Sequence, residues 1–221
     1  MYFNNAGWFL SAFYPSLIWK KKTKDKIIYL TFDDGPIPGV TEYVLEELAK
    51  FNVRATFFCV GDNIYKHPEV FKKILLAGHK IGNHTFNHLK GWKTEDETYL
   101  QNIARCEEII NKVQEEMGKE IRHSSFVART PNLFRPPYGL ITKSQIRKLK
   151  GKYAIIMWDV LTGDFNKDLS PEKCLHKAIK YTQKGSIVIF HDSIKAEANL
   201  RYALPRFLEH FSSNGYRFEV L

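Results

Sequence analysis

The sequence predicts an α/β fold built on a parallel sheet, which at this length can close into a barrel. Three observations support this. Strand patterns alternate with helical patterns about seven times along the chain. The 221 residues are 44% hydrophobic and carry no repeat or linker, so they can form one sizeable core. Finally, nearly every predicted strand ends in polar residues, as strands do at the functional face of a parallel barrel.

The stretch at residues 27–36 begins with the first predicted strand, since five of its first six residues are β-branched or aromatic. The strand stops at Asp33 and Asp34, which precede a Gly-Pro break. Along the rest of the chain, apolar residues at helical spacing, helix-capping residues and Gly or Pro breaks predict the other elements. They are helices at 40–51, 67–77, 94–117, 142–149, 170–181 and 196–211 (interrupted by Pro205), strands at 55–60, 79–82, 133–134, 153–160, 185–190 and 216–220, and a loop at 121–130.

Composition limits the partners and the redox setting. The formal charge is +9, but apart from residues 20–26 the lysines are spread out and no arginine-rich helix occurs. We therefore expect a solvated basic surface and no nucleic-acid partner, and no feature implies a protein partner. Cys59, Cys106 and Cys174 are odd in number and far apart, which argues against a disulfide framework and a Cys-x-x-Cys zinc site.

An apolar stretch at residues 8–19 precedes Lys20–Lys22 in what we treat as an N-terminal extension, residues 1–25. It lacks the features of a signal peptide and is too short and interrupted to span a bilayer. Two interpretations stay open. The stretch packs against the domain or covers a barrel end, or it is an interfacial anchor that contacts an anionic membrane. A cytoplasmic or membrane-peripheral location is slightly favoured.

The polar strand ends predict one site, because the carboxyl ends of parallel strands meet at one face. They are Asp33 and Asp34, His84, Arg135, Asp159 followed by Asp164, and His191 with Asp192.

His84 and His88 are four residues apart, so on a helical turn both imidazoles would lie on one face and could grip one metal ion. Asp33 or Asp34 can supply a carboxylate ligand. Adjacent side chains on an extended segment point in opposite directions, so one aspartate should bind the metal while the other accepts a proton from the water that the metal acidifies.

His191 is the expected proton donor to a leaving group, and Asp164 or Asp192 could hold its tautomer and raise its pKa. Arg135 cannot bind a metal and is expected to pair with an aspartate of the site.

Four motifs, taken together and in order, resemble those of NodB-type polysaccharide deacetylases, carbohydrate esterase family four. They are Thr31-Phe32-Asp33-Asp34-Gly35, His84-Thr85-Phe86-Asn87-His88, Arg135-Pro136-Pro137-Tyr138 and Ile189-Phe190-His191. The similarity covers residues 26–221. It implies a distorted (β/α) barrel with about seven parallel strands, one divalent metal ion (usually zinc, with cobalt, nickel and manganese as alternatives), and an acetylated amino-sugar polymer or oligomer as substrate.

The resemblance also implies a role for each residue. Asp33 would be the general base, oriented by Arg135, while Asp34, His84 and His88 would bind the metal. The backbone N–H of Tyr138 would help to stabilise the oxyanion, and His191 would protonate the leaving amine.

The stretch from Trp158 to Phe165 departs from the family pattern, in which an Asp-x-x-Asp-Trp arrangement is common. Leu161 stands where an acid is frequent and Phe165 replaces the Trp, whereas Asp164 is present to tune His191. We expect Tyr138, Trp158, Leu161 and Phe165 to contact the substrate, and the longer lead-in at residues 124–130 to shape the groove.

The sequence therefore predicts a metal-dependent hydrolase that removes an N-acetyl group from a chitin-type or peptidoglycan-type sugar chain. One alternative is an O-acetyl esterase or a deformylase acting on a lipid-linked amino sugar with the same residues. The others are a catalytically silent carbohydrate-binding relative and a two-histidine, one-carboxylate iron oxygenase.

Overall fold

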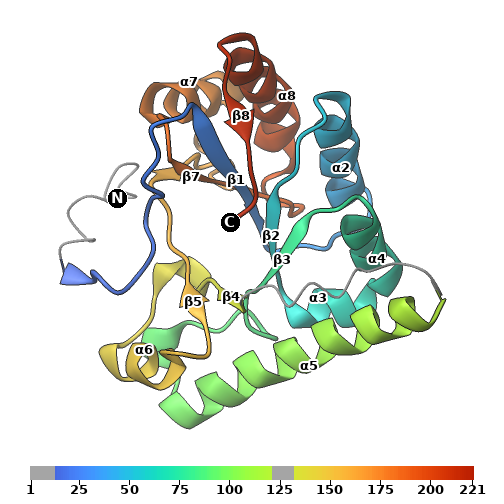
Figure 1. The fold of residues 1–221 in the computed structure, drawn as a ribbon, viewed down its shortest axis with the longest axis vertical. Coiled ribbons are helices and arrows are strands. Elements are labelled where there is room, and N and C mark those ends of the chain that lie inside the picture. Colours follow the sequence, from blue (N-terminus) through green and yellow to red (C-terminus); the bar gives the residue numbers. More distant parts are fainter. Residues whose placement is uncertain (1–12, 121–131) are drawn as a thin grey trace.

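The computed structural model describes residues 13–120 and 132–221 (Figure 1). The strands are β1 (Ile27–Asp33), β2 (Thr56–Cys59), β3 (Lys80–Asn83), β4 (Leu133–Phe134), β5 (Ala154–Ile155), β6 (Val160–Leu161), β7 (Ile187–His191) and β8 (Arg217–Phe218). The helices are α2 (Val40–Lys50), α3 (Gly61–Lys66), α4 (Pro68–Leu76), α5 (Asp96–Glu120), α6 (Lys143–Leu149), α7 (Pro171–Tyr181) and α8 (Glu197–Ser213), with 3₁₀ turns at η1 (Gly91–Lys93) and η2 (Pro137–Gly139).

Seven of the strands pair in parallel in the order β5-β4-β3-β2-β1-β7-β6, and β8 pairs with the start of β1. The sheet curls with helices around its outside, which confirms the predicted (β/α) barrel with about seven strands (Figure 1). β1 is central, and its last residue, Asp33, is the register partner of His191 on β7. The fold thus brings two predicted site residues together at the carboxyl ends of neighbouring strands.

β1 is buried on both faces, which explains its nearly continuous apolar sequence. Ile28, Leu30 and Phe32 belong to the large core between the sheet and the helices. Because side chains alternate along a strand, Thr31 and Asp33 lie on the opposite face, toward the barrel interior. The alternation therefore directs the Asp33 carboxylate inward.

The strand predicted at residues 153–160 is wrong as a single element. β5 pairs with β4, whereas β6 pairs with β7, so the two short strands are opposite edges of the sheet. The intervening residues, 156–159, cross from one edge to the other. The run is mostly apolar because most of it is buried, and burial alone does not reveal where a strand changes partner.

The N-terminal segment fills the gap between these two edges. The Ile18 N–H donates to the Ile155 carbonyl at 2.9 Å, the Met157 N–H donates to the Ile18 carbonyl at 2.7 Å, and the Lys21 N–H donates to the Gly185 carbonyl at 2.9 Å. We call residues 17–21 the seam segment. Its Leu17 and Trp19 are buried in a cluster with side chains of α5, α6 and β5. The domain boundary at residue 26 stays a prediction.

Trp19→Ala is expected to lower the free energy of unfolding by about 3–5 kcal/mol, because it removes a large buried ring from a packed cluster. Leu76→Ala is the matched control, since Leu76 is 61% exposed; it should change stability by less than about 0.5 kcal/mol. Chemical denaturation measures both, and equal midpoints for the two variants would contradict a structural role for the seam segment.

Two further elements differ from the sequence prediction. α3 directly follows the predicted strand at residues 55–60, where the sequence predicts no helix. α8 is continuous through Pro205, so the interruption predicted at this residue is wrong. Proline lacks the N–H that would bond the carbonyl of Arg201, but the Tyr43 hydroxyl donates to that carbonyl at 3.1 Å. A partner from α2 therefore satisfies the group that proline leaves free.

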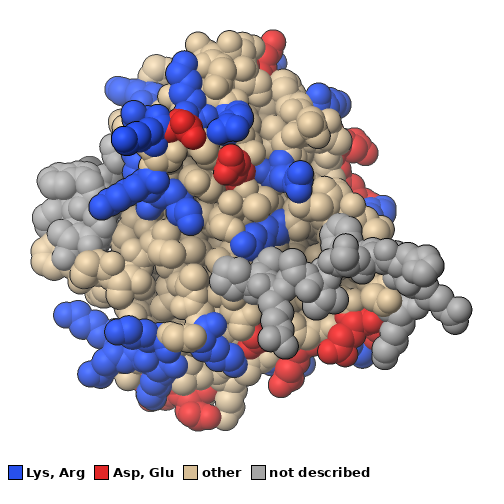
Figure 2. Space-filling model, in the orientation of Figure 1, with Lys and Arg blue, Asp and Glu red and all other residues tan. Residues whose placement is uncertain are grey.

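Lysine and arginine side chains gather on the face seen in Figure 2. Lys20, Lys21, Lys22 and Lys184 line a groove of about 830 Å³ beside the seam segment. In the described part of the chain, no helix is long and apolar enough to cross a bilayer. Contact with an anionic membrane stays a prediction, and the loop predicted at residues 121–130 lies outside the described residues.

Candidate active site

The two aspartates at the end of β1 point to different partners. Asp33 ends the strand, and Asp34 follows with a left-handed backbone (φ 84°), which turns its carboxylate away from that of its neighbour. Gly35 comes next because there is no room for a side chain. A Cβ placed there would lie 1.9 Å from the Asp192 carboxylate. The tight turn therefore requires the Asp-Asp-Gly sequence to end in glycine.

Arg135 crosses the barrel interior to Asp33. Its Nη1 donates to Asp33 Oδ1 at 2.6 Å and to the Thr31 hydroxyl at 2.8 Å, and its Nη2 donates to the Met157 carbonyl at 3.0 Å. Its guanidinium also stacks over the Phe58 ring at 4.1 Å. Arg135 is fully buried, and a buried charge requires such compensation. The contact fixes the Asp33 carboxylate in one orientation.

Asp34, His84 and His88 converge into a group with ligand atoms within 4.8 Å of one another. Asp34 Oδ1 lies 3.1 Å from His88 Nε2 and 3.7 Å from His84 Nε2. Ligands at metal–ligand distances of about 2.0–2.2 Å in a tetrahedral arrangement are roughly 3.4 Å apart. The two distances from Asp34 are close to this value, so the three side chains could hold one small divalent ion.

The protonation of the group also fits a metal. The Arg135 carbonyl lies 2.8 Å from His84 Nδ1, and because a carbonyl only accepts, Nδ1 carries the proton and Nε2 offers its lone pair to the centre. Burial lowers the pKa of His84 to about 4, so this ring is neutral at pH 7. Burial raises the pKa of Asp34, but the His88 hydrogen bond and the nearby His191 and His84 outweigh it, so the carboxyl is ionised.

The helical turn considered for His84–His88 is wrong. The segment is an irregular loop in which Thr85 (φ 62°) and His88 (φ 55°) are left-handed. Side-chain amides hold its backbone: Asn83 Oδ1 accepts from the Thr85 N–H at 2.8 Å, and Asn102 Oδ1 on α5 accepts from the N–H groups of residues 86 and 87. The two histidines meet because of this support. Sequence reasoning missed Asn83 and Asn102.

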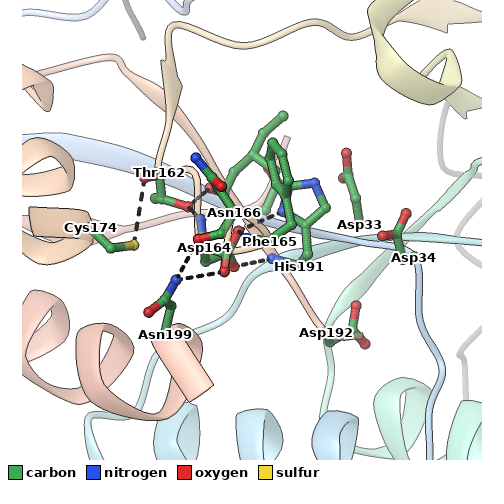
Figure 3. Close-up of polar contacts among 12 residues, drawn as sticks. Asp33, Asp34, Thr162, Asp164, Phe165, Asn166, Cys174, His191, Asp192 and Asn199 are labelled. Atoms are coloured by element: carbon green, nitrogen blue, oxygen red, sulfur yellow. Dashed lines mark hydrogen bonds and ion pairs between the residues drawn. The ribbon is translucent and has the colours of Figure 1, made fainter. Parts of the chain in front are cut away.

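His191 is held by Asp164 (Figure 3). Asp164 Oδ1 lies 2.8 Å from His191 Nδ1, and Asp164 Oδ2 accepts from the His191 backbone N–H at 2.7 Å. Burial lowers the pKa of His191, but the Asp164 charge and hydrogen bond raise it more, to about 9. Asn199 on α8 donates to the Asp164 carbonyl at 3.0 Å and so supports this loop. Sequence reasoning missed Asn199.

Two other acids lie elsewhere than the sequence suggested. The Asp192 carboxylate is not bonded to the His191 ring; it accepts from the Thr41 hydroxyl at 2.6 Å and from the Gly35 N–H at 3.0 Å. Burial raises the pKa of Asp192 to about 8. Asp159 lies at the start of β6, where it accepts from the Ser186 hydroxyl at 2.5 Å, so its expected place at a strand end near the site is wrong.

The four predicted substrate contacts differ in exposure. Tyr138 is 55% exposed, has a left-handed backbone (φ 60°) and lies 4.6 Å from the His88 ring. The half-buried Phe165 meets His191 edge-on at 4.9 Å. The half-buried Trp158 lies beside Gly139, the neighbour of Tyr138. Leu161 is buried within β6. Tyr138 and Phe165 therefore flank the two histidines.

Non-glycine residues with positive φ concentrate around this site. Of the five in the described chain, Asp34, Thr85, His88 and Tyr138 belong to it, whereas Asn52 follows α2. Such conformations cost free energy and tend to cluster at functional sites.

Comparisons with known proteins identify the relatives of this chain. The family model for polysaccharide deacetylases matches residues 20–154. A peptidoglycan-N-acetylglucosamine deacetylase of Bacillus cereus is 32% identical over 203 residues, which cover 90% of this chain and 88% of that protein. The peptidoglycan-N-acetylmuramic acid deacetylase PdaC of Bacillus subtilis is 29% identical over 201 residues, or 90% of this chain but only 39% of that longer protein.

Among solved structures, a crystal structure of a peptidoglycan N-acetylglucosamine deacetylase in complex with a substituted N-oxidanyl-benzamide superposes with a TM-score of 0.83. It is 28% identical, and the superposition covers 96% of this chain and 94% of the other. The family match spans more than half of the chain, and the similarity extends over nearly all of it. The chain therefore belongs to the polysaccharide deacetylase family, the NodB-type hydrolases of carbohydrate esterase family four.

Proposed function

We propose that this protein hydrolyses the N-acetyl group of an amino sugar in a glycan polymer or oligomer of the peptidoglycan or chitin type. The observation that carries the proposal is the convergence of three groups at one barrel face. The Asp34–His84–His88 set lies beside Asp33, which Arg135 orients, and near His191, which Asp164 orients. A base, a metal site and an acid are the groups that metal-assisted amide hydrolysis uses.

The placement of the base and the acid supports the following order of steps. Asp33 and His191 are register partners on adjacent parallel strands, so their Cα atoms are about 5 Å apart and their side chains leave the sheet on the same face. A water between them and the acyl carbon can give a proton to Asp33 as its oxygen attacks. The amide carbonyl then becomes an oxyanion, for which the backbone N–H of Tyr138 is the proposed donor.

His191 completes the reaction. Its Nδ1 is engaged by Asp164, which leaves Nε2 to carry the proton toward the substrate. Transfer of that proton to the nitrogen lets the C–N bond break, so the products are acetate and a free amino sugar. Because the pKa of His191 is raised to about 9, the ring is protonated at neutral pH and is ready to act as the acid.

Asp34, His84 and His88 would hold one divalent ion, for which zinc is the first candidate because two imidazoles and a carboxylate suit it. When bound, the ion would lower the pKa of the attacking water and polarise the acyl carbonyl. His84 Nε2 and Asp34 Oδ1 are already poised as ligands by the contacts described above.

Removing the metal is expected to lower acetate release by about 10³-fold or more, since a metal contributes several kcal/mol to such a transition state. Purified protein should contain one divalent ion per chain by elemental analysis. His84→Ala should lose that ion, whereas His176→Ala, an exposed histidine on α7, should keep it. Full activity of chelated, metal-free protein would contradict the proposal.

The substrate test compares acetate release from N-acetylglucosamine oligomers, peptidoglycan fragments and acetylxylan. Release from either of the first two, with little from the third, supports N-deacetylation. Release from acetylxylan alone favours the O-acetyl esterase alternative. If none of the three reacts while metal is bound, a lipid-linked or small amino sugar becomes the better hypothesis. If the wild type and Asp33→Asn are equally inactive, a catalytically silent binding relative becomes the better one.

A further inference from the structure

Two exposed lysines on the rim of the site are held above aromatic rings that touch the site's histidines. Lys90 Nζ lies 4.5 Å from the centre of the Tyr138 ring, which itself lies 4.6 Å from the His88 ring. On the other side, Lys195 Nζ lies 5.5 Å from the centre of the Phe165 ring, which lies 4.9 Å from the His191 ring. Figure 3 shows Phe165 against His191. Each ammonium is thus one aromatic ring away from a histidine of the site.

The carboxylates near the site do not balance these two cations. Asp33 is engaged by Arg135, Asp164 by His191, and Asp62 forms an ion pair with Lys66 at 2.5 Å. Within the described residues, no carboxylate lies within ion-pair distance of either Lys90 Nζ or Lys195 Nζ. Both side chains are exposed. The entrance to the site therefore carries two positive charges that are open to a ligand.

The rings restrict where these charges can be. Cation–π contact attracts an ammonium to the face of a ring, and the long lysine chain otherwise has several rotamers to choose from. Because the Tyr138 ring contacts His88 and the Phe165 ring contacts His191, a glycan chain whose acetyl group lies between these histidines can extend past either ring. Charged substituents near the reacting sugar then come within reach of an ammonium.

From this arrangement we infer that Lys90 and Lys195 bind carboxylate groups of the glycan, so that the site selects acidic amino-sugar chains over neutral ones. The inference rests on the proposed N-deacetylation and specifies its substrate class. The carboxylates would belong to a lactyl ether on the sugar or to a peptide attached to it. Exposed ion pairs are individually weak and screened by salt, so the selectivity should be moderate and should fall as ionic strength rises.

The test uses one oligosaccharide of alternating N-acetylglucosamine and N-acetylmuramic acid in two forms, with its carboxylates free or converted to neutral amides. For the wild type, kcat/KM should be about 5- to 10-fold higher for the free-carboxylate form, as two exposed ion pairs allow. In the double variant Lys90→Gln, Lys195→Gln this ratio should fall close to one. Raising the salt concentration should lower the wild-type ratio in the same direction.

Lys180→Gln is the matched control. Lys180 is also exposed and lies 5.6 Å from the centre of an aromatic ring, that of Tyr181, but on α7 away from the site. It should leave the ratio as in the wild type. An equal ratio in wild type and double variant, or no wild-type preference for the carboxylate form, would overturn the inference.

Equilibrium binding separates this inference from the proposed reaction. The two oligosaccharide forms are titrated into Asp33→Asn protein with and without the two lysine substitutions, and heat release reports the affinity. Tighter binding of the carboxylate form that disappears with the lysines supports the inference even if no acetate is ever released. Release of acetate from both forms with equal binding sinks the inference and leaves the proposed reaction intact.

Discussion

Asp33→Asn is expected to lower kcat/KM for acetate release by about 10³-fold, the range that general-base catalysis supplies. Asparagine keeps the size of the side chain and still accepts the Arg135 hydrogen bond through its amide oxygen, but it cannot take a proton from water. Asp34, His84 and His88 are unchanged, so the bound metal should stay at one ion per chain. The measurement is steady-state kinetics together with elemental analysis on the same preparation.

Asp159→Asn is the control for this substitution. Asp159 is also buried and bonded, to Ser186 and Lys20, but it lies at the start of β6 away from the site. Its variant should be less stable and yet retain most of the activity per folded molecule. If Asp33→Asn kept more than about a tenth of the wild-type activity, Asp33 would not be the base.

Asp164→Asn is expected to move the alkaline limit of activity downward by more than about one pH unit. His191 must be protonated to donate, and its pKa of about 9 keeps it so up to roughly that pH. Without the Asp164 charge, burial lowers the pKa of His191, so the fraction of protonated ring at pH 8 falls. The rate at pH 8 should drop by about 10²-fold, and by less at pH 6.

A pH–rate profile of wild type and variant at equal metal content measures this shift. Asp168→Asn, an exposed acid in the same loop, serves as the control and should leave the profile unchanged. The contribution of this pair to folding stability also falls as the pH rises. Because folding raises the pKa of His191, its pairing with Asp164 stabilises the protein fully below about pH 6.5 and loses that contribution as the pH rises through about 9. Superimposable rate profiles would mean that Asp164 does not tune His191.

The sequence predicted which side chains would converge better than it predicted the loops and contacts that bring them together. Asp33, Asp34 and His191 follow apolar strands, so their positions at one barrel face could be inferred from alternation and strand polarity alone. The spacing of His84 and His88 suggested a shared ligand role, but the structure joins them through left-handed residues and not a helical turn. No local sequence pattern predicts a loop of this kind.

The supporting asparagines could not be found from sequence for a different reason. Asn102 on α5 and Asn199 on α8 are distant in sequence from the loops that they hold, and in the sequence each resembles any other helix residue. Likewise, the apolar run at residues 153–160 gave no sign of its change of partner between β5 and β6. These features depend on contacts between residues that are far apart in the sequence, and such contacts cannot be predicted from local patterns in one sequence.

The seam segment has a practical consequence for attaching this protein to a support. Lys21 bonds to Gly185 before the start of β7, whereas Asp33 and His191 lie at the far ends of β1 and β7. The exposed Lys184, which directly precedes Gly185, therefore offers a coupling point at the amino end of β7, opposite the strand ends that carry Asp33 and His191. An enzyme coupled to beads in this way should keep access to long glycan chains, which coupling through the rim lysines would obstruct.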